Sequence, residues 1–176
     1  MSGFTKRLKG PLDCFISSLF ADKTTNQHVL DFEFETGTLF SNDATDVIDV
    51  ALDAQTPYNN YATMKMIQGK GIRIGKTSIK VIHFGGSTNG TSDNEIITYN
   101  DFTFNNNSIY KIHLTATTTG ISYTVKEYWS DVEVGARGVS MPDVAWQASE
   151  NSSGMLMYTK VTHGSEFGIR EITLVN

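Results

Sequence analysis

Apolar and polar residues alternate one by one over residues 28–36, and this period of two restricts the fold more than any other feature of the chain. Leu30, Phe32 and Phe34 alternate with three carboxylates in the segment HVLDFEFET. Successive side chains of a β-strand point to opposite faces, so the pattern predicts a strand with one buried face and one wet face. Gly37 follows and is expected to end it.

Further short apolar segments, separated by Gly- and Asn-rich turn signals, run through the rest of the chain. The predicted strands cover Asp46 to Leu52, residues 61–67, residues 71–75, Ser78 to Phe84, Glu95 to Tyr99, Ile109 to Ala116, Ile121 to Tyr128, Gly154 to His163 and Phe167 to Val175. Turns or loops are expected at Gly69-Lys70-Gly71, residues 85–94, Asn105-Asn106-Asn107 and Thr117 to Gly120, and residues 129–153 are less regular. No strand–helix rhythm occurs, so the pattern predicts an all-β, antiparallel sandwich or barrel.

The first 27 residues differ from this pattern and are predicted to form an arm ahead of a sandwich domain at 28–176. Their apolar residues fall at helical spacing, and they are Leu12, Phe15, Ile16, Leu19 and Phe20. The arm is therefore expected to be a short helix or an extended segment. Either it packs on its own domain, or it is an assembly element inserted into a partner or between copies of the chain.

Composition excludes several classes of function. The chain has 14 Lys and Arg against 19 Asp and Glu, a formal net charge of −5, which argues against charge-driven binding of nucleic acid. Its one cysteine permits no internal disulfide. No apolar run is long enough for a transmembrane helix. Gly10-Pro11 and Asp13 interrupt the only stretch that imitates a secretory signal.

Three segments resemble the concanavalin A-like lectin/glucanase jelly roll. VLDFEFETG (residues 29–37) is similar to the opening strand of that fold, residues 106–129 to its mid-chain hairpin, and FGIREITLV (residues 167–175) to its closing strand, which pairs beside the first. The resemblance implies a two-sheet jelly roll. The composition of the chain, rich in Asn, Thr and Gly, also resembles that of phage tail-fibre and virion surface proteins.

A carboxylate series is the strongest catalytic candidate. Asp31, Glu33 and Glu35 share one face of the predicted strand. The jelly-roll glucanases resembled above use a strand triad in the order Glu-x-Asp-x-Glu, but here the order is Asp, Glu, Glu, and the series lies in the first strand. Both departures favour a simple polar strand face and a non-enzymatic protein.

Aromatic and amide residues provide candidates for sugar binding, because rings stack on sugars and amides bind hydroxyl groups. The ligand-binding candidates are Tyr58, Asn59, Asn60, Tyr61, Trp129, Asp131 and Trp146. No cofactor is expected. The four histidines show no metal-binding spacing, and no metal site is predicted.

These observations and resemblances lead to one functional prediction and two alternatives. The main prediction is a non-enzymatic virion surface, fibre or decoration module, which forms a homo-oligomer such as a trimer. Its arm would dock it to other virion proteins, and its loops would contact host glycan or capsid protein. It would lie in the virion, and in the cytoplasm before assembly. The alternatives are a carbohydrate-binding or glycan-degrading jelly-roll domain, and a subunit that binds only protein.

Overall fold

The computed structural model shows a chain built from antiparallel β-strands. It describes residues 5–9, 12–19, 27–40, 46–55, 68–84, 94–100, 103–140, 155–161 and 166–175. The strands are β1 (Thr5–Lys9), β2 (Leu12–Leu19), β3 (Gln27–Glu35), β4 (Val47–Gln55), β5 (Gln68–Ile74), β6 (Ile79–Phe84), β7 (Asn94–Tyr99), β8 (Ile109–Thr117), β9 (Gly120–Glu127), β10 (Glu133–Ser140), β11 (Met155–Val161) and β12 (Glu166–Val175).

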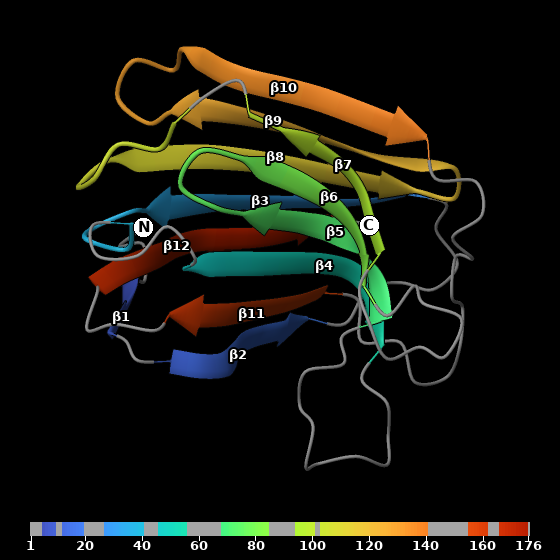
Figure 1. Ribbon diagram of the computed structural model, residues 1–176, viewed down its shortest axis with the longest axis horizontal. Coiled ribbons are helices and arrows are strands. Elements are labelled where there is room, and N and C mark those ends of the chain that lie inside the picture. Colours follow the sequence, from blue (N-terminus) through green and yellow to red (C-terminus); the bar gives the residue numbers. More distant parts are fainter. Residues whose placement is uncertain are drawn as a thin grey trace.

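The strands form two six-stranded sheets that lie face to face (Figure 1). Sheet A has the order β1-β12-β3-β8-β9-β10, and sheet B has the order β2-β11-β4-β5-β6-β7. Every pairing between neighbours is antiparallel. The predicted all-β, two-sheet antiparallel sandwich is therefore confirmed.

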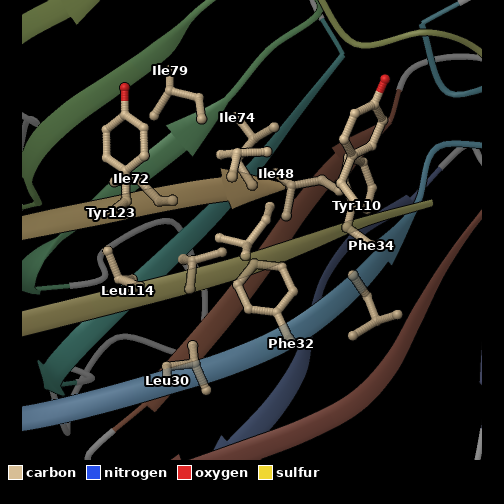
Figure 2. Packing of buried hydrophobic residues seen from close by; sticks show 14 of the residues in the cluster. Leu30, Phe32, Phe34, Ile48, Ile72, Ile74, Ile79, Tyr110, Leu114 and Tyr123 are labelled. Atoms are coloured by element: carbon tan, nitrogen blue, oxygen red, sulfur yellow. The ribbon is translucent and has the colours of Figure 1, made fainter. Parts of the chain in front are cut away.

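The core fills the space between the sheets. Leu30, Phe32 and Phe34 of β3 face the isoleucines of sheet B, among them Ile48 and Ile72 (Figure 2). All five side chains are at most 2% exposed. Burial of side chains of this size stabilises the fold by about 1.5–3 kcal/mol each.

Aromatic rings close one end of the core. Phe104 lies in the loop before β8 and packs edge-on against Phe34 and Tyr110, with ring centroids 5.8 and 4.9 Å apart. It also stacks on Phe40 at 6.1 Å. Phe104 thus fills this end of the core from a loop rather than from a strand.

Two pairings agree with what the resemblance implied. β8 and β9 form a hairpin around Thr118 and Thr119, within the predicted turn. The closing strand β12 pairs beside β3, with Ile169 opposite Phe34. These two neighbours give β3 a central place in sheet A.

Two predictions about local structure were wrong. Gly69-Lys70-Gly71 is part of β5 rather than a turn, since Gly71 makes a close approach to β4 and Lys70 is buried. The Lys70 ammonium donates to the backbone carbonyl of Thr117 in the other sheet at 2.5 Å. The irregular region also contains a strand, β10, whose glycines and exposed residues hid the alternation at the edge of sheet A.

The N-terminal segment is extended, one of the two conformations predicted for the arm. β1 pairs with β12, and β2 pairs with β11. The helical spacing of its apolar residues is overridden because pairing with a neighbouring strand satisfies the backbone. The predicted strand 61–67, the loop at 85–93 and the assembly residue Phe20 lie outside the described residues.

A glycine substitution tests the junction after β3. Gly37 has a φ of 49°, and a Cβ there would lie 2.2 Å from the carbonyl oxygen of Glu166. Gly37→Ala is expected to lower the free energy of unfolding by at least about 2 kcal/mol, through left-handed strain and this clash. Gly75→Ala is the matched control, because the nearest atom to its Cβ would be 3.5 Å away. Urea denaturation of both variants measures the difference, and equal stabilities would contradict the structure.

Candidate functional site

A groove of about 620 Å³ lies on the outer face of sheet A, opposite the core. The strand alternation that buries Leu30, Phe32 and Phe34 turns Asp31 and Glu33 to this face. The groove also receives side chains from β8, β9, β10 and β12. Its polar lining comes from strands that are far apart in the sequence.

The register of the strands sets the polar residues in two rows across the sheet. In the first row Asp31 lies opposite His113 of β8 and Thr173 of β12, and His113 lies opposite Thr124 of β9. In the second row the order across the strands is Arg170, Glu33, Lys111, Lys126 and Glu133. A ligand lying across the strands would therefore meet both acidic and basic groups.

Asp31 and His113 form the closest pair of the first row. His113 Nδ1 lies 2.7 Å from Asp31 Oδ1, and both side chains are about half exposed. The hydroxyl of Thr115 lies 3.2 Å from His113 Nε2. The imidazole is thus held at both nitrogens while one side of it stays open to a ligand.

Glu33 is the most buried carboxylate of the groove. It is 8% exposed, and its Oε2 lies 3.6 Å from Arg170 Nε, too far for a hydrogen bond. Burial raises the pKa of Glu33, and the nearby carboxylate of Glu171 raises it further, against the opposing effect of Arg170 and Lys111. Desolvation and a like charge both disfavour the ionised form.

A β-bulge in β12 places Glu171 in this groove. The pairing of β12 with β3 shifts register between Arg170 and Thr173, and Glu171 has a φ of 47°. Regular alternation would turn Glu171 to the core side, as with Ile169. The bulge instead puts Glu171 into the groove lining and lets Ile172 pack on the core. Such bulges redirect side chains and often carry glycine at the left-handed position.

The turn after β9 forms one end of the groove. Asp131 forms ion pairs with two lysines: Lys111 Nζ lies 3.1 Å from its Oδ1, and Lys126 Nζ lies 3.5 Å from its Oδ2. The hydrogen bond and charge of Lys111, with the charge of Lys126, hold the pKa of this carboxyl below its usual range. Trp129, two residues earlier, is 83% exposed and packs edge-on against Tyr128. Lys111 and Arg170 lie over the Tyr128 ring at 5.3 and 5.7 Å.

The structure brings together some of the sequence-predicted residues. Asp31, Glu33 and Asp131 line the groove, and Trp129 lies on its adjoining turn, whereas Glu35 is on the same strand but outside the lining. The remaining ligand-binding candidates lie outside the described residues, and they are Tyr58, Asn59, Asn60, Tyr61 and Trp146.

Sequence reasoning missed His113, Lys111 and Glu171 as site residues. The sequence of β8 predicts which of its residues face outward, but it does not predict how β8 is aligned with β3. Among the described residues no group of three or more His, Cys, Asp and Glu could hold a metal ion. In the same part of the chain, no helix has the length and apolar character needed to cross a membrane.

The fold matches known sugar-binding structures. No protein-family model matches the chain, and no curated protein matches its sequence. The structure is similar to the VIP36 exoplasmic/lumenal domain in its Ca²⁺/Man₃GlcNAc-bound form, at 9% identity and TM-score 0.58, covering 98% of this chain and 74% of that chain. It is similar to the carbohydrate recognition domain of Emp46p, at 11% identity and TM-score 0.58, covering 97% and 77%.

Sheep galectin-11 in complex with glycerol also matches, at 9% identity and TM-score 0.53, over 96% of this chain and 99% of that one. Alginate lyase A1-II' matches at 12% identity and TM-score 0.48, over 90% of this chain, which spans only 63% of the lyase. At such identities the matches with TM-scores above 0.5 show the fold alone, a concanavalin-like jelly-roll sandwich.

The raised pKa of Glu33 predicts a specific pH dependence of stability. Because the folded protein holds the Glu33 proton more tightly than the unfolded chain, this group stabilises the fold below the usual pKa of 4.5, and the contribution is lost as the pH rises. Glu33→Gln should therefore gain stability relative to the wild type as the pH rises from 4.5 to 7, measured by urea denaturation.

Glu95→Gln is the matched control with the opposite sign. Hydrogen bonds from Lys80 and Thr98 lower the pKa of Glu95. Its contribution is present above its usual pKa and is lost as the pH falls, so this variant should lose stability relative to the wild type as the pH rises. Identical pH trends for the two variants would contradict the assignment.

Proposed function

We propose that the chain is a carbohydrate-binding domain and that the groove on the outer face of sheet A is its binding site. The observation that carries the proposal is the groove itself, about 620 Å³ in volume and crossed by two rows of hydrogen-bonding side chains. A volume of this order accommodates a small ligand.

The lining offers the hydrogen-bonding groups that sugar hydroxyls require. Asp31 and Glu133 present acceptors, Lys126 presents a donor, and the hydroxyls of Thr124 and Thr173 can act as either. A sugar ring carries hydroxyls that both donate and accept. A face with mixed groups at the spacing of a β-ladder suits an oligosaccharide laid across the strands.

Trp129 supplies the apolar side of the proposed site. Its ring is 83% exposed and packs edge-on against Tyr128, and Asp131, two residues further along the turn, lines the groove. An exposed tryptophan held in place is a platform for the apolar face of a sugar ring.

The matched structures support this proposal through their fold. VIP36 was solved with a mannose-containing oligosaccharide, and Emp46p is described as a carbohydrate recognition domain. Because one fold hosts many functions, the groove and not the likeness carries the proposal. The virion module rests on composition and stays a prediction, compatible with a glycan-binding domain.

A second candidate is glycan cleavage, favoured by Glu33. A carboxyl whose pKa is raised by burial inside a groove has the property of a general acid. Release of reducing ends from any bound glycan would support this candidate, and Glu33→Gln should then abolish the release while binding persists.

A glycan array with the purified chain is the first test of binding. A specific hit followed by titration calorimetry gives the affinity of the wild type. Trp129→Ala is expected to weaken the affinity about tenfold, since an aromatic contact contributes about 0.5–1.5 kcal/mol beyond its buried area. Asp31→Asn should weaken it by a similar factor, because it loses a charged hydrogen-bond acceptor.

The control is Val132→Ala, on the same turn and 56% exposed, which should leave the affinity unchanged. The proposal would be overturned if the folded protein bound no glycan on the array and also bound none of the same oligosaccharides at millimolar concentrations in solution.

A further inference from the structure

The charge of the groove is unbalanced. Its lining contains two lysines and one histidine, Lys111, Lys126 and His113, against five carboxylates, which are Asp31, Glu33, Asp131, Glu133 and Glu171. A ligand in this groove therefore meets an excess of negative charge, in a concave surface that concentrates the field.

The cations of the groove already contact carboxylates or rings of the protein. Lys111 and Lys126 both pair with Asp131. Arg170 lies against Glu33 and over the Tyr128 ring. In the described part of the chain, neither Glu133 nor Glu171 forms an ion pair. Two lysines against one carboxylate leave one positive charge beside Asp131, which does not balance the other four carboxylates of the lining, so the groove as a whole is anionic.

Glu33 gives a second and independent observation. The side chain is nine-tenths buried in the groove floor, and neither its Oε2 nor Arg170 Nε, 3.6 Å away, has a hydrogen-bond partner among the described residues. A buried carboxylate without full hydrogen bonding is costly. Glu171 beside it adds a second carboxylate that the bulge in β12 directs to the groove. A cationic donor that settles between these two carboxylates would relieve both.

The acidic groups of the groove are not clustered in the way that metal ligands are. The described residues contain no cluster of His, Cys, Asp and Glu tight enough for a metal. The carboxylates instead spread over β3, β12 and the start of β10, across the width of the groove. A ligand with its positive charges spread along its length fits this arrangement.

We propose that the groove selects amino sugars, that is, glycan units with a free protonated amine, over N-acetylated, neutral and uronic acid units. This inference rests on the proposed carbohydrate-binding function and names its ligand class. The ammonium groups would face Glu171 with Glu33 and, at the other side of the groove, Glu133. The sugar ring hydroxyls would use Asp31, and the ring at the end of the groove would stack on Trp129.

The test compares two oligosaccharides that differ only at the amine. Calorimetry with a glucosamine hexamer and an N-acetylglucosamine hexamer is carried out at mildly acidic pH, where the free amines are protonated. The glucosamine hexamer is expected to bind at least about tenfold more tightly, since a charge-assisted hydrogen bond is about twice as strong as a neutral one. The ratio should shrink in high salt. An alginate oligosaccharide of similar length should bind more weakly than either.

Two variants connect the preference to the proposed residues. Glu171→Gln should lower the ratio between the two hexamers while leaving the affinity for the N-acetylated hexamer unchanged. Glu133→Gln should also lower the ratio, through a larger loss of affinity for the glucosamine hexamer than for the N-acetylated one. Glu171 and Glu133 are exposed, so these variants should fold. Glu95→Gln on sheet B removes the same charge outside the groove and should leave the ratio as in the wild type.

The outcomes separate the inference from the function that it rests on. Equal or tighter binding of the N-acetylated hexamer overturns the amino-sugar preference and leaves the carbohydrate-binding proposal standing. If neither these hexamers nor any arrayed glycan binds to the folded protein, both proposals fail. A hexalysine that binds as tightly as the glucosamine hexamer would show that the groove selects charge alone, which also overturns the preference.

Discussion

The side-chain alternation of β3 supports both surfaces of sheet A. On one side Phe32 and Phe34 complete the core against sheet B, and on the other Asp31 and Glu33 form the floor of the groove. β3 can serve both because it pairs with β12 and β8 along nearly its whole length, which fixes its register from two sides. If the register of β3 shifted by one residue, carboxylates would replace phenylalanines in the core. The same register therefore fixes both the packing of the core and the position of the site.

The groove depends on a departure from regular structure in the neighbouring strand. If β12 followed β3 without a bulge, Glu171 would face the core and Ile172 the solvent. The left-handed conformation of Glu171 costs about 1–3 kcal/mol, and it persists because the pairing on both sides of the bulge holds it. The result is a second carboxylate beside Glu33 on the outer face of sheet A.

The parts of the fold that could be predicted from the sequence are those whose pattern depends only on neighbouring residues. The alternation of β3 and the Thr-Gly turn of the β8–β9 hairpin were readable because each depends on adjacent residues. β10 was missed because an edge strand with one exposed face needs no regular apolar series. Gly69-Lys70-Gly71 was misread because glycine also permits close approach between strands, as Gly71 does beside β4. In the site, Asp31 and Glu33 followed from their own strand, whereas His113 and Glu171 depend on register and a bulge between segments far apart in the chain.

The strand order also has a consequence for synthesis on the ribosome. β12 lies between β1 and β3, and β11 lies between β2 and β4. β1 and β2 therefore have no partner strand in either sheet until residues 155–175 have left the exit tunnel. At about 5–20 residues per second, residues 5–19 wait on the order of ten seconds for their partners. During that time they are unpaired segments whose backbone hydrogen-bonds to water, and chaperones that bind unfolded apolar segments would act on this part of the nascent chain.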